Sequence, residues 1–216
     1  MDLTRPLAVV TPTVDGDVLA ALVLADAWFT PRRLQTSIGR HSEDGVRRAL
    51  RRLVSQGIVD DQAAGNAVLY RLNRLHLAAV PIAELANLWS TFLRRTAKAL
   101  ESWPVQPKVA ALFGSAARGT MTAESDIDVF LVEPGDGPRA GDRDDPRWRS
   151  QVLELEQEAS RWTGNDVRVL TMTEGHVRAH VADEPVLLDI VSEGVCIDGD
   201  FDWLRRMVAR SRLERA

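Results

Sequence analysis

The chain has 216 residues, which is enough for one large domain or for two small domains that each bury a core. Hydrophobic residues make up 45% of the chain and charged residues 27%, with a net charge of −4, and this excludes the composition of a disordered chain. No apolar stretch approaches the roughly 20 residues of a membrane span, the acidic start is unlike a signal peptide, and the single Cys196 excludes an internal disulfide, so we expect a cytoplasmic protein that does not bind membranes.

Charge is distributed unevenly along the chain. Residues 1–103 carry 13 basic and 10 acidic side chains, whereas residues 104–216 carry 14 basic and 21 acidic ones. A mildly basic front half and an acidic back half favour two domains with different roles. Because Pro104 and Pro107 interrupt the chain between the halves, we expect domains at 1–74 and 104–216, joined by a helical linker at 75–103.

The front half predicts three helices followed by a hairpin. Apolar spacing predicts a helix over 16–29, the Thr30-Pro31 start and Gly39 bound a second helix, and Ser42 begins a third that ends at Gly57. Residues 58–59 and 67–72 are typical of short strands around a loop at 60–66. In this order of elements, residues 16–74 resemble a winged helix-turn-helix domain.

Arginines in this domain favour a nucleic-acid partner. Residues 32–52 contain seven arginines and two acidic residues, and in a helix-turn-helix the second helix enters the major groove of DNA. The expected DNA contacts are Arg32, Arg33, Arg40, Ser42, Arg47 and Arg48. The wing carries Asp60 and Asp61, which argues against its insertion into the minor groove. Dimerisation, which would give a homodimer, and docking of an acceptor are the alternative roles.

The back half alternates strands and helices. Strands are expected at 108–113, 126–132, 166–171 and 194–197, and helices at 147–162, 173–192 and from 201 onward, with a turn-rich loop at 134–146. The pattern predicts an α/β (α+β) fold, a mixed sheet flanked by helices. Trp148, beside the loop, is an expected contact for a base or an acceptor.

Two groups of residues in this half carry chemistry. Gly114 follows an apolar strand, so the backbone can turn there and approach a phosphate, and Ser115 adds a hydroxyl to the amide N–H groups of the turn. Asp126 and Asp128 lie on one face of the next strand, because side chains alternate between faces. Paired carboxylate oxygens suit Mg²⁺, which completes its coordination with phosphates and water.

This arrangement resembles the signature of the DNA polymerase β-type nucleotidyltransferases, and among them the minimal nucleotidyltransferases. Gly114-Ser115 is followed after ten residues by Asp126-Ile127-Asp128, and the resemblance covers about residues 105–199. It implies transfer of a nucleoside monophosphate from an NTP to a hydroxyl group, with release of pyrophosphate. Two Mg²⁺ ions would be held by Asp126 and Asp128, and the NTP would be bound by Gly114, Ser115, Arg118 and Gly119.

The sequence departs from the family at its third carboxylate, which is expected on a later strand. Arg168 stands at that position, and a cation there would repel Mg²⁺. Asp166, two residues earlier on the same strand face, is the candidate third catalytic acid if the strand shifts by one pair of residues, and Asp189 is a weaker candidate. If neither reaches the site, the domain would bind Mg²⁺ and NTP without transfer.

Two functions follow from these expectations. The first is a Mg²⁺-dependent nucleotidyltransferase that binds DNA and modifies a hydroxyl of a small molecule, a tRNA or a partner toxin protein, the last by analogy with minimal nucleotidyltransferase antitoxins. The alternative is a DNA-binding regulator or antitoxin whose nucleotidyltransferase domain senses nucleotide or is inactive.

Overall fold

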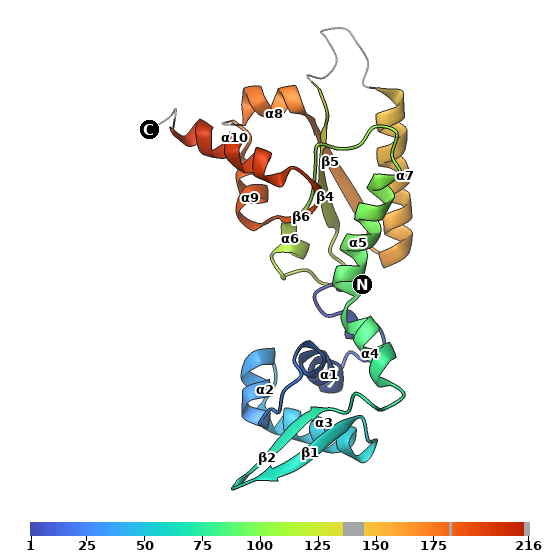
Figure 1. The fold of residues 1–216 in the computed structure, drawn as a ribbon, viewed down its shortest axis with the longest axis vertical. Coiled ribbons are helices and arrows are strands. Elements are labelled where there is room, and N and C mark those ends of the chain that lie inside the picture. Colours follow the sequence, from blue (N-terminus) through green and yellow to red (C-terminus); the bar gives the residue numbers. More distant parts are fainter. Residues whose placement is uncertain (136–144, 182, 214–216) are drawn as a thin grey trace. The chain divides into compact units, whose positions relative to one another are not determined.

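The computed structural model describes residues 1–135, 145–181 and 183–213, and the chain divides into two compact units (Figure 1). Asp2–Trp89 form the N-terminal unit, and Met1 with Ser90–Ala216 forms the C-terminal unit. Most of the loop expected at 134–146 lies outside the described residues. Of the helices that the structure describes, none has the length and apolar character to cross a membrane.

The N-terminal unit consists of helices and one two-stranded sheet. Its elements are the 3₁₀ helix η1 (Pro6–Val9), helices α1 (Val14–Leu24), α2 (Pro31–Ile38) and α3 (Glu43–Ser55), the antiparallel strands β1 (Val59–Ala64) and β2 (Ala67–Leu72), and helix α4 (Ala79–Ala86). Thr30 and Ser42 cap α2 and α3, accepting the N–H groups of Arg33 and Gly45. The core is built on Leu22, Leu34 and Leu50, all fully buried.

Two local predictions for this unit were wrong. The first helix ends at Leu24 rather than at Phe29, because Phe29 forms an antiparallel bridge with Tyr70 through two hydrogen bonds of 2.8 Å. The hairpin is longer than expected, because its polar residues pair across the strands, for example Asp61 with Tyr70. The chain reverses at Gly65, which adopts a φ of 60°.

The C-terminal unit is built around a four-stranded mixed sheet. The elements from α5 onward are α5 (Leu88–Glu101), β3 (Val109–Phe113), α6 (Gly114–Ala117), β4 (Ile127–Glu133), α7 (Pro146–Thr163), β5 (Val167–Thr173), α8 (Glu174–His180), α9 (Pro185–Glu193), β6 (Val195–Gly199) and α10 (Phe201–Leu213). The strand order is β5-β4-β3-β6, with β4 and β5 parallel and the other pairs antiparallel. The single helix expected at 173–192 is two helices, because Pro185 starts a new one.

Helices cover both faces of this sheet (Figure 1). Phe130 and Val132 of β4 pack with buried residues of α8, α9 and α10, whereas Val129 and Leu131 point to the other face, which α7 covers. Asp128 shares the face of Phe130 because the two are two positions apart on the strand, with only Val129 between them. Asp128 therefore lies at the start of β4 on the side of α8–α10.

A buried carboxylate links the sheet to α8. Glu174 accepts the N–H of Gly135 at 3.3 Å, contacts Lys108 Nζ at 3.4 Å, and is bonded to Arg178. Burial acts to raise the pKa of Glu174, but these donors and cations outweigh it and hold the pKa below its ordinary value. A lowered folded-state pKa stabilises the protein above the unfolded-state pKa, and that stabilisation is lost as the pH falls through the folded-state value.

We therefore expect Glu174→Gln to reduce the free energy of unfolding at pH 7 by about 1–3 kcal/mol, the range for a disturbed buried polar group. The loss should shrink as the pH falls below the ordinary glutamate pKa of about 4.3 and through the lowered folded-state pKa of Glu174, because protonation of the wild-type carboxylate then removes the same contribution. Urea unfolding of both proteins at pH 7 and at pH 3.5 measures it. An equal difference at the two pH values would contradict the electrostatic explanation.

Candidate functional site

The turn after β3 brings Gly114 against Asp128. Gly114 has a φ of 71°, and a Cβ built on it would lie 2.3 Å from Oδ2 of Asp128. A side chain at this position would force the carboxylate of Asp128 or the turn to move, and L-residues disfavour that φ. In the antiparallel register Phe113 pairs with Asp128, so the end of β3 and the start of β4 meet at this point. The Gly114-Ser115 motif and the acidic motif, which ten residues separate in the sequence, are therefore in contact in the fold.

Asp126 and Asp128 form the acidic pair of the site. Asp126 directly precedes β4, and its side chain is 37% exposed. Burial raises the pKa of Asp128 above its ordinary value, the negative charge of Asp126 raises it further, and Arg168 and Arg118 partly oppose the shift. Asp128 is therefore held beside a second carboxylate in a partly desolvated place, a state that a bound cation relieves.

Arg168 stands opposite this pair on the neighbouring strand. In the parallel register Arg168 pairs with Asp128, and its Nη1 lies 2.7 Å from Oδ2 of Asp126. Its Nε lies 3.0 Å from Oδ2 of Asp166, the residue that precedes β5. The strand is not shifted, so Arg168, rather than Asp166, faces Asp128. Asp189 lies exposed on α9.

The residues expected to bind nucleotide surround the same turn. Ser115 is the second residue of α6, and its carbonyl accepts the N–H of Thr120 at 3.0 Å. Arg118 follows α6, and its Nη1 donates to Oε2 of Glu193 at the end of α9 at 3.3 Å. Gly119 has a φ of 71° with open space at its Cβ position. Since α6 is a single turn, phosphate binding here would depend on individual N–H groups.

The donor set fits one divalent cation. Asp126 and Asp128 present carboxylate oxygens on one face, in the number that Mg²⁺ takes from a protein when phosphates and water complete its coordination. In the part of the chain that the structure describes, no group of three or more His, Cys, Asp or Glu side chains is arranged to hold a metal ion.

The residues expected to contact DNA lie on exposed parts of the N-terminal unit. Arg32 and Arg33 are on α2, Arg40 follows it, Ser42 caps α3, and Arg47 and Arg48 are on α3. The hydroxyl oxygen of Ser42 accepts the N–H of Gly45 at 3.1 Å, and Arg47 is ion-paired with Glu43. Each of the five arginines is exposed.

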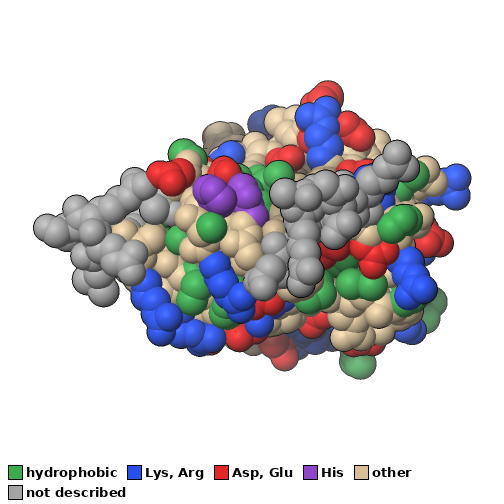
Figure 2. Space-filling model, turned by 90° about the horizontal axis from the view of Figure 1, so that it is seen from above, with side chains coloured by type: hydrophobic (Ala, Val, Ile, Leu, Met, Phe, Trp, Pro, Cys, Tyr) green, Lys and Arg blue, Asp and Glu red, His purple; other side chains and the backbone are tan. Residues whose placement is uncertain are grey.

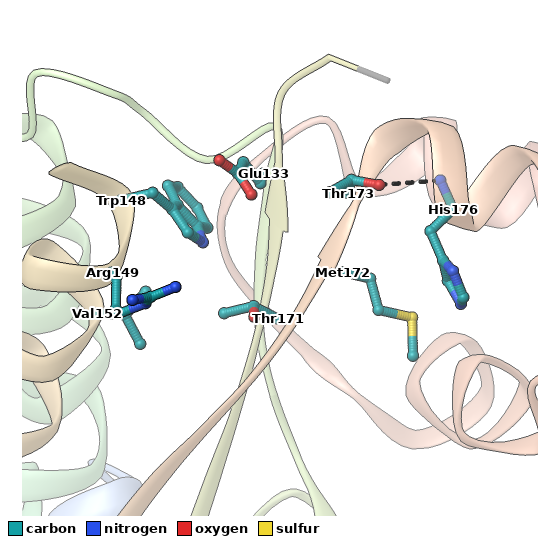
Figure 3. A pocket seen from close by; sticks show the side chains of 8 residues that line it. All are labelled: Glu133, Trp148, Arg149, Val152, Thr171, Met172, Thr173 and His176. Carbon is teal, nitrogen blue, oxygen red and sulfur yellow. Dashed lines mark hydrogen bonds between the residues drawn. The ribbon is translucent and has the colours of Figure 1, made fainter. Parts of the chain in front are cut away.

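A cavity of about 560 Å³ lies at the opposite ends of β4 and β5 (Figure 3). Its lining residues are Glu133, Trp148, Arg149, Val152, Thr171, Met172, Thr173 and His176. Asp128 and Glu133 are five residues apart, which is roughly 16 Å along a strand, so the cavity does not contain the acidic pair. Trp148 is 3% exposed, and among the described residues its Nε1 has no hydrogen-bond partner.

Two stacked imidazoles lie near this cavity. The rings of His176 and His180 on α8 are 4.5 Å apart, and histidine side chains appear together on the face shown in Figure 2. Nε2 of His176 is 3.1 Å from Oε1 of Glu184. Sequence reasoning missed this cavity, and it also missed the contact between Arg118 and Glu193. These residues are distant in the sequence and share no motif, so only the folded chain brings them together.

The chain is similar to one protein family and to several solved structures. Residues 93–185 match the family model described as a nucleotidyltransferase domain. No curated protein matches the chain.

Three solved structures show partial similarity. One is a toxin–antitoxin with AMP-PNP (19% identity, 57% of this chain and 86% of that chain covered, TM-score 0.40). Another is a tri-AMPylated HEPN toxin of Shewanella oneidensis in complex with MNT antitoxin (16% identity, 58% and 85% covered, TM-score 0.37). A third is TrmBL2, an archaeal chromatin protein (16% identity, 84% and 72% covered, TM-score 0.26).

The matched segment spans both motifs, from α5 through the Gly114 turn and the acidic pair to the start of α9. The mixed α/β class predicted from the sequence is confirmed, and residues 93–185 of the C-terminal unit match a nucleotidyltransferase-domain family.

Proposed function

We propose that the chain transfers a nucleoside monophosphate from a Mg²⁺-bound NTP to a hydroxyl acceptor. The contact between Gly114 and Asp128 carries the proposal, because it brings a turn at a glycine with positive φ directly against a carboxylate whose charge a cation would stabilise. Asp126 and Asp128 would hold the ion, and N–H groups at Gly114 and Ser115 would bind the β- and γ-phosphates.

The reaction is an in-line displacement at the α-phosphorus. The acceptor oxygen forms a new P–O bond, the bond from the α-phosphorus to the bridging oxygen breaks, and pyrophosphate leaves. Bound Mg²⁺ supplies positive charge that neutralises the phosphate oxygens. Although β5 is not shifted, we propose Asp166 as the acceptor of the hydroxyl proton, since it is an exposed carboxylate that Arg168 links to Asp126. Arg118 would contact the phosphates, and the Gly119 turn would give the backbone room beside them.

Pyrophosphate release tests the proposal. The full chain is incubated with each α-labelled NTP, Mg²⁺ and one acceptor class at a time: small hydroxyl compounds, tRNA, and proteins co-purified with the chain. The proposal expects labelled acceptor and equimolar pyrophosphate in one of these, both abolished by a chelator. Nucleotide binding without pyrophosphate release for any acceptor would favour a nucleotide sensor.

The exposed arginines favour a second role for the N-terminal unit. Arg32, Arg33, Arg40, Arg47 and Arg48 lie on or beside two consecutive helices that precede a hairpin, the element order of a winged helix-turn-helix. We propose that this unit binds DNA with α3 in the major groove, and that Ser42, at the N-terminus of α3, lies near the bases.

The double variant Arg47→Ala/Arg48→Ala should weaken binding to DNA from the chain's own promoter at least about tenfold, because it removes two positive charges that would contact the DNA. The dependence of the affinity on salt concentration should also become weaker, since fewer counterions are released. Arg205→Ala/Arg206→Ala on α10 is the matched control, because it removes two adjacent exposed arginines from the other unit. Fluorescence anisotropy at several salt concentrations measures both. Equal affinity for promoter and random DNA would leave dimerisation or acceptor docking as the role of this unit.

A further inference from the structure

We infer that the site takes one divalent cation with its nucleotide, and that the guanidinium of Arg168 supplies the positive charge that a second cation would otherwise supply. This inference rests on the proposed function, because it concerns the site of Asp126 and Asp128.

The register of the sheet sets Arg168 in this place. Strands β4 and β5 pair without interruption from Ile127 with Val167 to Glu133 with Thr173, so Asp128 faces Arg168. Side chains of paired residues on neighbouring strands point to the same face, and the strands lie about 4.8 Å apart. Leu170 of β5 packs in the same core as Phe130, which confirms that Arg168 and Asp128 share a face.

Arg168 engages the carboxylates that a second ion would need. Its Nη1 is 2.7 Å from Oδ2 of Asp126, and its Nε is 3.0 Å from Oδ2 of Asp166. One guanidinium thus binds one member of the acidic pair and also the alternative third acid. A divalent cation between Asp126 and Asp166 would have to displace a positive charge that two carboxylates already hold.

The remaining oxygens suffice for one ion. The ion pair of Arg168 with Asp126 is made through Oδ2, so Oδ1 of Asp126 and the carboxylate of Asp128 would be the ligands of the ion, and Gly114 leaves room for Asp128 that a side chain would fill. Arg168 is 63% exposed, so its guanidinium is open to solvent beside the acidic pair. A guanidinium has a fixed charge and a planar fork of donors that suits phosphate oxygens.

Counting bound Mn²⁺ by electron paramagnetic resonance tests the inference without any turnover. The full chain is saturated with a non-hydrolysable analogue of each NTP and titrated with Mn²⁺, together with the variants Arg168→Lys, Arg168→Gln and Arg168→Asp. We expect one bound Mn²⁺ per nucleotide for the wild type and for Arg168→Lys, which keeps the charge. Arg168→Asp should bind two, because it removes the cation and adds a third carboxylate.

Arg168→Gln keeps the test decisive if Arg168→Asp does not fold. It removes the charge without adding a ligand, so it should still bind one Mn²⁺ but with an affinity at least fivefold higher than the wild type. An unchanged affinity, two ions in the wild type, or one ion in a folded Arg168→Asp variant would overturn the inference while leaving the proposed function intact. Failure of the wild type to bind any of the four analogues would instead overturn the proposed function.

Discussion

Replacing Asp128 with Asn should reduce NTP-dependent pyrophosphate release at least 100-fold without destabilising the fold. The loss follows because an amide cannot replace a carboxylate as a ligand of Mg²⁺, and bound metal contributes several kcal/mol to such reactions, at about 1.4 kcal/mol per tenfold. The pKa of Asp128 is raised by burial and by Asp126, so its charge is unfavourable to the empty folded state near neutral pH. Removing that charge should leave the melting temperature unchanged or slightly higher.

Asp202→Asn on α10 is the matched control, because Asp202 is exposed and far along the chain from both motifs. It should retain activity and stability. The two variants are compared by pyrophosphate release, Mn²⁺ binding and thermal unfolding. A wild-type rate in Asp128→Asn would remove the acidic pair from the mechanism, and a large drop in its melting temperature would mean that Asp128 is structural.

Replacing Gly114 with Ala should abolish nucleotide binding at the site. The added Cβ would overlap Oδ2 of Asp128, which lies 2.3 Å from its position, so either the turn or the carboxylate must move. The φ of 71° adds a cost of about 1–2 kcal/mol for an L-residue. We expect a loss of stability of that size or more, together with loss of nucleotide affinity beyond measurement.

Gly39→Ala separates the two causes. Gly39, in the N-terminal unit, has a similar φ of 72°, but nothing lies within 4 Å of the position that its Cβ would take. It should therefore lose only the backbone contribution to stability and keep most of its nucleotide affinity. Isothermal titration with a non-hydrolysable NTP and chemical unfolding measure the two effects. If both variants lose affinity equally, the close approach of Gly114 to Asp128 is not what the site requires.

Residue spacing predicted the centre of the site because its geometry is local. Gly114 follows one strand and Asp128 starts the next, and an antiparallel hairpin-like pairing of these strands brings their adjoining ends together. The alternation of side chains then sets Asp126 and Asp128 on one face. Nothing distant in the chain is needed for that conclusion.

The surroundings of the site could be predicted only in part. Sequence comparison with the family set Arg168 at the third acid position, but its contacts with Asp126 and Asp166 depend on strand register and side-chain reach. Arg118 binds Glu193, which is 75 residues away, and no periodic pattern encodes such a pair. The cavity beside Trp148 likewise arises from four elements that meet only in the folded chain.

Element boundaries failed where tertiary pairing competed with local preference. Apolar spacing extended the first helix to Phe29, yet Phe29 pairs with Tyr70 of the hairpin instead. The polar residues of β1 led to the prediction of a loop at 60–66. They form a strand nevertheless, because an exposed two-stranded sheet does not require apolar side chains on both faces. Pro185 indicates the start of a new helix, because proline is disfavoured inside a helix, and the prediction of one continuous helix over 173–192 did not take it into account.

The central claim is that the turn at Gly114 and the acidic pair bind a nucleotide with its metal. A crystal structure of the full chain with a non-hydrolysable NTP and Mn²⁺ tests it most directly, since Mn²⁺ is located by its anomalous scattering. The account predicts the triphosphate against the backbone of Gly114 and Ser115, with an anomalous peak between the carboxylates of Asp126 and Asp128. A nucleotide bound in the cavity of Trp148, or phosphates at the turn with no metal at the carboxylates, would contradict it.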